Sequence, residues 1–385
     1  MLPLAPHTLR QLALGTVTGI VLRPLDGPRT AIGSFAIGWL AGDFAPQLLA
    51  ASLTDTALAV RRHRATPLGL ALTAATTVGL GVAIGSAWRS RITLAEAAHT
   101  SPLPRPPLRR LLRPLHFRDT AVRVDRNLPY GPYGGRNRLD LYRPADRDGD
   151  GAPVLVQIHG GGWTIGSKEQ QGRLLMNAMA AQGWVCVAIN YRLAPRSRWP
   201  AHLDDVRAAL GWVQREIRSY GGDPGHVVLT GGSAGGHLAA LAALTAAPGS
   251  IAACVPFYGV YDLLGEDQDV FTLGMRESLL APRIFAPDAV DEDYRVASPL
   301  HQVHPDAPDF LVLHGRLDTL VSVRQARAFV ARLRAVSRGR VDYAELALTQ
   351  HAFDVVGSVR AHHAVAAVSR WLVRHHAERT SPSLP

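Results

Sequence analysis

The chain has 385 residues, of which 47% are hydrophobic and 19% are charged. These values are ordinary for a globular protein and exclude a disordered or collagen-like chain, and the length suffices for one large α/β domain with an appendage. The formal net charge of +10 comes almost entirely from Arg residues scattered along the chain, because Lys168 is the sole lysine. No aromatic-studded basic stripe accompanies them, so we predict no nucleic-acid partner.

The first hundred residues contain apolar runs at 11–22, 31–53 and 68–88. Only the third approaches the run of about 20 apolar residues that a membrane-spanning helix needs. The first run is short, and the second carries Asp43, which is costly inside a bilayer. We interpret residues 1–100 as an apolar helical region that anchors the protein to a membrane, with no preferred side indicated by the Arg distribution. The alternative is a set of buried helices in a soluble cap domain.

Residues 101–116 are rich in Pro and Arg and are predicted to form a linker, because repeated Pro removes backbone donors and extends the preceding residues. From about residue 117, short β-rich runs alternate with longer amphipathic runs, which is typical of a mostly parallel sheet with helices on both faces. The predicted strands are 154–158, 185–190, 227–230, 252–257, 310–313 and 341–346, with a helix over 203–219. Cys186 and Cys254 fall in these buried runs, so we expect core residues rather than a disulfide or a metal site.

Residues 227–238 predict a strand, a G-x-S-x-G turn and an Ala/Leu-rich helix. Gly231 and Gly235 flank Ser233, as a sharp strand-to-helix turn requires, because no side chain fits beside the nucleophile. The Ser233 hydroxyl is then exposed at the top of the sheet. The N–H group of Ala234, at the positive end of the helix, can bind the oxygen that becomes negative in a tetrahedral intermediate.

A glycine run, His159-Gly160-Gly161-Gly162-Trp163, follows the strand predicted at 154–158 and lacks the spacing of a phosphate-binding loop. Together with the G-x-S-x-G turn, Asn-Tyr-Arg-Leu-Ala-Pro at 190–195 and Gly-Asp-Pro at 222–224, it resembles the hormone-sensitive-lipase-like esterases of the α/β-hydrolase superfamily. The resemblance covers residues 117–374, approximately. It implies that the N–H groups of Gly161 and Gly162 complete an oxyanion hole with Ala234.

One position departs from that family. Many members carry Asp directly before the nucleophile, whereas this chain has Gly232. This difference brings the sequence nearer to related carboxylesterase and formamidase-like branches. An amidase or arylformamidase on the same scaffold is therefore an alternative function.

Two further residues follow predicted strands. Asp318 comes after the strand at 310–313 and His351 after the strand at 341–346, which gives the order Ser, Asp, His of α/β-hydrolases. A hydroxyl is a poor nucleophile near neutral pH, so Ser233 needs His351 as base, and Asp318 orients and stabilises the imidazolium. Asp262 is an alternative acid, although we expect it to cap the helix that follows.

The remaining histidines and Trp163 are expected to be structural. His159, His237 and His314 each have a place in the predicted core, and the pairs at 362–363 and 375–376 lie on a terminal helix without an acidic or Cys partner. We therefore predict no metal ligands and no cofactor.

The sequence thus predicts an α/β-hydrolase fold, a doubly wound and mostly parallel sheet over residues 117–378, with a partial cap at 263–303 over the acyl pocket. The predicted function is a serine carboxylesterase or lipase that hydrolyses small-molecule or lipid esters through an acyl-enzyme. A non-catalytic hydrolase-fold protein that binds a ligand or partner is the second alternative. Because every predicted catalytic residue follows the linker, we expect residues 1–100 to contribute nothing to the chemical step, and a chain beginning near Arg113 to remain soluble and active.

Overall fold

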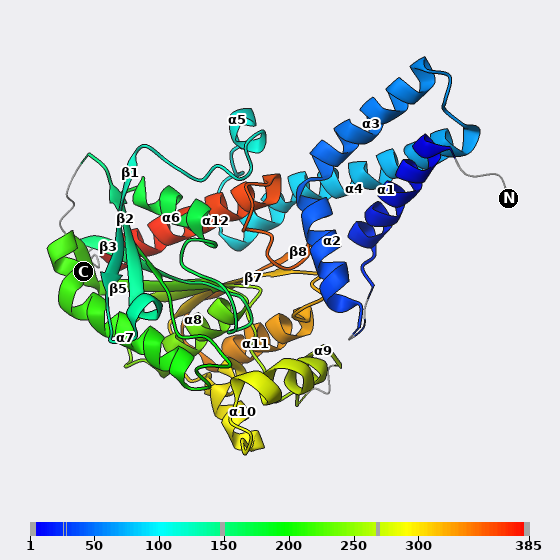
Figure 1. Ribbon diagram of the computed structural model, residues 1–385. Helices are drawn as coiled ribbons and strands as arrows, with labels where there is room; N and C mark the ends of the chain where they lie inside the picture. The colour runs from blue at the N-terminus through cyan, green and yellow to red at the C-terminus, as the bar shows by residue number, and fades with distance from the viewer. Residues whose placement is uncertain (1–4, 26, 28, 147–150, 267–269, 381–385) are drawn as a thin grey trace.

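An eight-stranded sheet forms the centre of the protein, in the order β1-β2-β4-β3-β5-β6-β7-β8 (Figure 1). The computed structural model describes residues 5–25, 27, 29–146, 151–266 and 270–380. Strands β3 to β8 are parallel, whereas β2 is antiparallel to β4 and β1 is antiparallel to β2. The strands are β1 (Val122–Pro129), β2 (Arg138–Pro144), β3 (Ala152–Ile158), β4 (Val185–Ile189), β5 (Gly222–Gly232), β6 (Ala253–Phe257), β7 (Asp309–Gly315) and β8 (Val341–Leu346).

The doubly wound, mostly parallel sheet predicted from the sequence is confirmed, and the predicted strands correspond to β3 through β8. Strands β1 and β2 were not predicted. Both carry charged residues between their apolar ones, and the side chains of β1 are only half-buried or exposed. The edge strand β1 and its neighbour β2 lack the continuous apolar run by which buried parallel strands are recognised.

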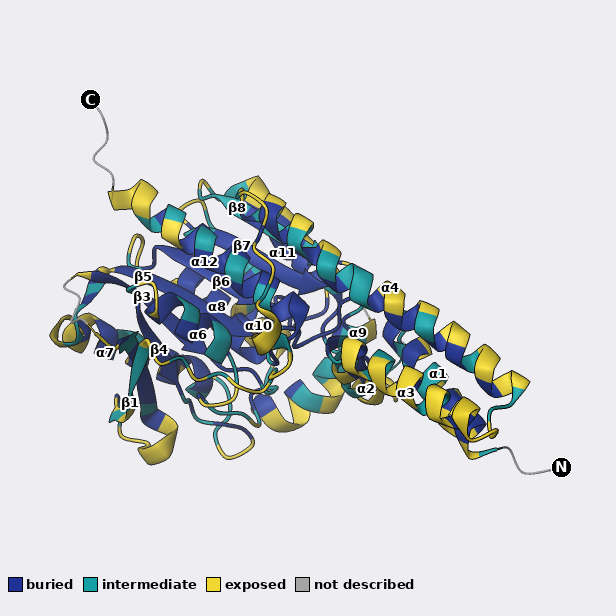
Figure 2. Cartoon of the chain, turned by 90° about the horizontal axis from the view of Figure 1, so that it is seen from above, coloured by how far each residue is buried: buried dark blue, intermediate teal, exposed yellow. Residues whose placement is uncertain are grey.

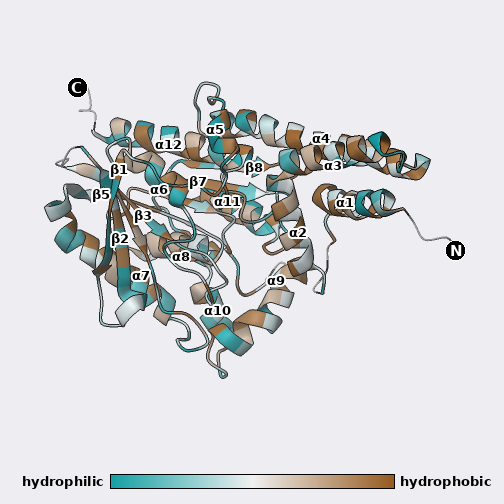
Figure 3. Cartoon of the chain, turned by 45° about the horizontal axis from the view of Figure 1, so that its top comes forward, coloured by the Kyte–Doolittle hydropathy of each residue, from teal (hydrophilic) through white to brown (hydrophobic). Residues whose placement is uncertain are grey.

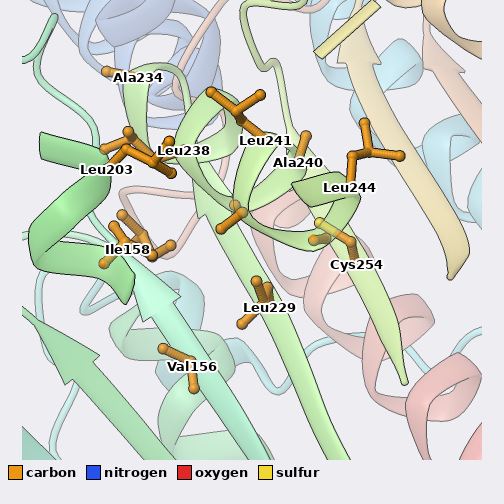
Figure 4. Packing of buried hydrophobic residues seen from close by; sticks show 14 of the residues in the cluster. Val156, Ile158, Leu203, Leu229, Ala234, Leu238, Ala240, Leu241, Leu244 and Cys254 are labelled. Atoms are coloured by element: carbon orange, nitrogen blue, oxygen red, sulfur yellow. The ribbon is translucent and has the colours of Figure 1, made fainter. Parts of the chain in front are cut away.

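Helices cover both faces of the sheet, and successive side chains of a strand point to opposite faces. Val154, Val156 and Ile158 of β3 join the apolar cluster beneath one helical layer, whereas Leu155 joins the cluster on the other face. The first layer contains α7 (Ala201–Glu216), α8 (Ala234–Thr245) and α11 (Val323–Val336), and the second contains α6 (Arg173–Ala180) and α12 (Val359–Thr380). Figure 4 shows Val156 and Ile158 beneath residues of α7 and α8. Cys186 and Cys254 are free and buried, as expected for core residues.

The N-terminal region is helical. It comprises α1 (Pro6–Leu22), α2 (Ala31–Asp43), α3 (Ala45–Arg61) and α4 (Pro67–Ala97), followed by the short α5 (Leu108–Leu111). The apolar run at 31–53 forms two helices rather than one, because Pro46 lies in the first turn of α3 and has no N–H to continue α2. The run at 68–88 continues to Ala97 as part of the long α4.

Helices α1 and α3 and the first half of α4 form an arm that projects from the sheet domain (Figures 1 and 2). The second half of α4 lies on the sheet domain instead. Leu94 and Ala98 are both 1% exposed and share an apolar cluster with Trp371 of α12. Leu103, in the Pro-rich segment that follows, is buried in the same cluster. Helix α4 therefore joins the arm directly to the sheet domain.

An insertion follows β6, where the partial cap was expected. It contains α9 (Val270–Met275), the π-helical segment η3 (Arg276–Ile284), α10 (Asp291–Ala297) and the short 3-10 helix η4 (Pro299–Gln302). The other short 3-10 helices are η1 (Gly134–Asn137) and η2 (Ile217–Tyr220). Residues 267–269 of the predicted cap lie outside the described residues. Leu280, Ile284 and Phe285 are buried in the core cluster, so the insertion is packed on the domain.

Candidate active site

Ser233 occupies a sharp turn between β5 and α8. Its backbone has φ 58° and ψ −124°, a left-handed conformation that non-glycine residues adopt at a cost. A Cβ atom on Gly235 would lie 2.1 Å from the carbonyl oxygen of Ile158, and one on Gly231 would lie 2.5 Å from the same oxygen. Only glycine fits at these two positions, so the close approach of β3, β5 and α8 explains the G-x-S-x-G spacing.

Gly232, the departure from the family pattern, also has a local cause. A Cβ atom at this position would lie 2.6 Å from the hydroxyl of Tyr258. Tyr258 follows β6, and its hydroxyl donates a hydrogen bond to the carboxylate of Asp354. The Tyr258 ring thus occupies the space that an Asp side chain before the nucleophile would need.

Asp318 and His351 meet at the carboxyl edge of the sheet, beyond β7 and β8. His351 Nδ1 lies 2.6 Å from Asp318 Oδ2, and both side chains are at least 95% buried. The other carboxylate oxygen of Asp318 accepts hydrogen bonds from the N–H groups of Leu320 and Val321, each at 2.9 Å. Burial would raise the pKa of Asp318, but the charge of His351 and hydrogen bonds from neighbouring histidines more than offset this and hold it below its usual range.

His314 is a contributor to this site that the sequence did not identify. Its Nε2 atom lies 3.3 Å from Asp318 Oδ2 and 3.0 Å from the carbonyl oxygen of Val321. The sequence signal is its position four residues before Asp318, at the end of β7. His314 is therefore a buried residue in contact with the Asp318 carboxylate.

The glycine loop after β3 lies beside the nucleophile. A Cβ atom on Gly160 would be 3.1 Å from Cβ of Ser233. Gly161 and Gly162 have φ values of 119° and 56°, which side chains rarely permit. Within the described residues, the N–H groups of Gly161, Gly162 and Ala234 have no intramolecular hydrogen bond. These three donors are free to bind an oxygen at Ser233.

Trp163 and His237 form part of the core behind this loop. Trp163 is 1% exposed, and its indole N–H donates to His237 Nδ1 at 3.2 Å. His237 Nε2 must then carry the proton, which it donates to the carbonyl of Ala297 at 2.8 Å. Burial lowers the pKa of His237 to about 4, so its ring is neutral near pH 7. The structural role expected for both residues agrees with these contacts.

Ser233 and His351 face a common neighbour. Tyr258 borders Gly232, and its ring centroid lies 4.4 Å from that of His351. Among the described residues no hydrogen bond joins the Ser233 hydroxyl to His351. Such bonds are often long in unliganded hydrolases and shorten when substrate binds.

The alternative acid, Asp262, has other partners. Its carboxylate accepts hydrogen bonds from the N–H groups of Leu264 and Gly265, both at 2.9 Å, and so stabilises the turn that begins the insertion. Within the part of the chain that the structure describes, no cluster of three or more His, Cys, Asp or Glu side chains is placed to hold a metal ion.

Comparisons with known proteins agree on the class of the chain. The BD-FAE family model matches residues 139–333. The chain is 44% identical over 370 residues to the probable carboxylic ester hydrolase LipM of Mycobacterium tuberculosis, covering 91% of this chain and 80% of that protein. It is 44% identical over 271 residues to the esterase LipQ of the same organism, covering 67% of this chain and 63% of LipQ.

Solved structures of esterases share the fold. Thermogutta terrifontis esterase 2 phosphonylated by sarin superposes with a TM-score of 0.57 and 25% identity, covering 66% of this chain and 95% of that chain. A Pyrobaculum calidifontis esterase superposes with a TM-score of 0.53 and 23% identity, covering 77% of this chain and 93% of the other.

Proposed function

The chain belongs to the BD-FAE family of α/β-hydrolase esterases and is a carboxylic ester hydrolase, and we propose that Ser233, His351 and Asp318 are its catalytic triad. The resemblance to hormone-sensitive-lipase-like esterases is thereby confirmed. The observation that carries the triad is the 2.6 Å hydrogen bond between His351 and Asp318 at the sheet edge where the strained turn presents Ser233.

The proposed reaction begins with attack of Ser233 Oγ on the ester carbonyl carbon, while His351 Nε2 takes the hydroxyl proton. Asp318 holds Nδ1–H and stabilises the imidazolium that forms. The tetrahedral intermediate then collapses, and the alcohol leaves with the proton from His351. Water, deprotonated by His351, attacks the acyl-enzyme in the same way and releases the carboxylic acid.

The negative oxygen of each tetrahedral intermediate is assigned to the N–H groups of Gly161, Gly162 and Ala234. Their lack of internal partners supports this assignment, as does the position of Ala234 at the first turn of α8, where the helix dipole is positive. Leu279 of the insertion lies 3.5 Å from where a Cβ on Gly162 would be. This contact supports a role of the insertion as a partial cap.

We further propose that the arm associates with a membrane. One helix among the described residues, α4, is long and apolar enough to span a bilayer, although buried helices of soluble proteins can meet the same criterion. The stronger support is that the arm buries many polar side chains and exposes many apolar ones, alongside an apolar cluster that includes Val21, Ala45, Leu80 and Ala83. Its buried polar residues include His7, Thr8, Gln11, Ser52, Thr73 and Thr76, and its exposed apolar residues include Leu9, Leu12, Leu53, Leu68, Val78 and Val82 (Figures 2 and 3).

Hydrogen bonds between helices account for the polar interior of the arm. Ser52 donates to Gln11 at 2.9 Å, and Thr56 bonds Thr73 at 2.9 Å. A water-soluble helical bundle exposes mainly polar side chains, whereas this arm exposes many apolar ones. Polar side chains that bond between helices, surrounded by apolar ones, are typical of helices packed in lipid. The arm would place the enzyme beside membrane-dissolved esters.

A series of p-nitrophenyl esters of rising acyl length tests the catalytic part of this proposal. The full-length enzyme and Ser219→Ala, which alters an exposed serine of η2, should hydrolyse the series at equal rates. Ser233→Ala should lose activity by several orders of magnitude without unfolding. Near-normal turnover in Ser233→Ala contradicts the mechanism.

Flotation with phospholipid vesicles tests the membrane part. Replacing Val78 and Val82, which are 67% and 49% exposed on α4, with Gln should release protein from vesicles. The matched change of Val290 and Val296, which are 61% and 54% exposed at α10, should leave binding unchanged. Equal binding by the two double variants contradicts the role of the arm.

A further inference from the structure

Helix α2 of the N-terminal region contacts the proposed catalytic base. The ring of Phe35 lies edge-on to the imidazole of His351, with centroids 5.8 Å apart and an interplanar angle of 84°. Phe35 also stacks on Trp39, one turn further along α2, at 5.6 Å. The imidazole is therefore bordered by an aromatic ring from α2 as well as by Tyr258. This contact is at odds with the expectation that residues 1–100 contribute nothing to the chemical step.

A second set of contacts joins α2 to the loops that carry the acid and the base. Gln350 links these loops, because its Oε1 atom accepts hydrogen bonds from the N–H groups of Thr319 and His351 at 3.1 and 3.0 Å. The hydroxyl of Thr319 donates to the carbonyl of Ala31, in the first turn of α2, at 3.1 Å. The Gln350 side chain also lies against Gly38, where a Cβ atom would be 3.2 Å from Gln350 Cγ.

The end of α2 is fixed beside the same loop. Asp43 lies 3.9 Å from Arg360, and the two side chains are 2% and 5% exposed. Arg360 in turn donates to the carbonyl of Leu348, three residues before His351, at 3.2 Å. Burial raises the pKa of Asp43 to about 7, and the nearby Arg360 guanidinium partly offsets this by favouring the charged carboxylate. The start of α2 is thus bonded to the loop that carries the acid, and its end contacts Arg360 of α12, which is bonded to the loop that carries the base.

We propose that α2 is a positioning element for the reaction, and that Phe35 is the residue through which it acts on His351. The inference rests on the catalytic triad proposed above. His351 must direct Nε2 toward Ser233 while Nδ1 stays on Asp318, and small displacements of a catalytic group lower rates steeply. The Phe35 ring limits movement of the imidazole away from this orientation. The N-terminal region then supports catalysis in addition to binding the membrane.

Steady-state kinetics of the full-length protein on p-nitrophenyl acetate test this role. Phe35→Ala should lower kcat about tenfold or more while KM changes less than about twofold, because a small ester has little contact with α2. The matched control is Ile32→Ala on the same helix, where the side chain is 73% exposed, and its kcat should equal that of the wild type. Phe35→Tyr should restore most of kcat, whereas Phe35→Leu, which keeps apolar volume but not the ring, should not.

Thr319→Val provides a second test that leaves α2 itself unaltered. It keeps the shape of the side chain and removes both the hydrogen bond to the carbonyl of Ala31 and the one accepted from Gln350 Nε2, so kcat should fall several-fold. Wild-type kcat in both Phe35→Ala and Thr319→Val overturns the inference, as does full rescue by Phe35→Leu. Ser233→Ala, assayed alongside, separates the outcomes. If Ser233→Ala is inactive while Phe35→Ala and Thr319→Val keep wild-type kcat, the proposed triad is supported and only the proposed role of α2 is contradicted.

Discussion

Replacing Gly161 with Ala tests the oxyanion hole at its most constrained residue. At φ 119°, an added Cβ would lie 2.2 Å from the carbonyl oxygen of Ile165 and 2.8 Å from its carbon. Both atoms belong to the backbone, so the loop itself must move and take the Gly161 N–H with it. Loss of one oxyanion donor raises the barrier by about 3 kcal/mol, which corresponds to a loss in kcat of about 100-fold or more.

Gly162 provides an internal comparison for this prediction. An added Cβ there would meet only Leu279 at 3.5 Å and Thr164 at 3.9 Å, so Gly162→Ala carries only the cost of about 1 to 2 kcal/mol for a left-handed alanine. We expect Gly162→Ala to lose less kcat than Gly161→Ala. Gly135→Ala, with no atom within 4 Å of the new Cβ, should be unchanged.

The assay is steady-state hydrolysis of p-nitrophenyl butyrate, with folding checked by circular dichroism. Because the lost interaction is made with the transition state, kcat should fall much more than KM rises. A folded Gly161→Ala variant with kcat within about threefold of the Gly135→Ala control would refute the assignment of this loop.

Three further predictions concern the acid, a buried histidine and the sole lysine. Asp318→Asn should lower kcat by about 10³- to 10⁴-fold in the same assay, because the amide no longer stabilises the imidazolium. The His237 pKa is lowered to about 4 from 6.5, so the unfolded chain binds a proton that the folded one does not. The contribution of His237 to stability should therefore be full above pH 6.5 and fall toward pH 4 by up to about 3 kcal/mol, in addition to the losses from His159, His202, His226 and His362, whose pKa values burial also lowers to about 4. In urea denaturation, the total fall should be smaller in His237→Gln than in the exposed-site control His116→Gln. Lys168→Met should destabilise the fold by about 3 to 5 kcal/mol by leaving Asp140, 2.9 Å from Lys168 Nζ, with a buried charge, whereas the exposed Arg118→Met should not.

Local sequence patterns were sufficient to predict the turn at Ser233 and the parallel strands. The turn at Ser233 needs glycine at 231 and 235 because backbone atoms of β3 and α8 lie within 2.5 Å of any added Cβ. The residues that meet this constraint lie within five consecutive positions, so the turn can be predicted without knowledge of the fold. The strand before Asp318 is likewise an almost continuous apolar run, as its burial in the sheet requires, whereas the strand before His351 alternates buried and half-buried residues at the edge of the sheet.

Contacts between segments that are far apart in the sequence could not be predicted from local sequence patterns. Phe35 and His351 are more than 300 residues apart in the sequence, and nothing in the pattern of α2 indicates which loop it will meet. The contact between Gly232 and Tyr258 could not be predicted either. The sequence shows that the Asp found before the nucleophile in many family members is absent, but not that the Tyr258 ring occupies its space. The apolar helical region was predicted from hydropathy, but the hydrogen bonds buried between its helices depend on how α1, α3 and α4 pair.

Covalent labelling by a fluorophosphonate tests the central claim most directly, because the reagent forms a stable adduct only with an activated nucleophile. Mass spectrometry of the digested, labelled full-length protein should find the phosphonyl group on Ser233, with loss of esterase activity in proportion to labelling. Labelling should disappear in Ser233→Ala and slow strongly in His351→Ala, while Ser219→Ala labels as the wild type does. An adduct on another residue, or full inhibition without modification of Ser233, would contradict the account.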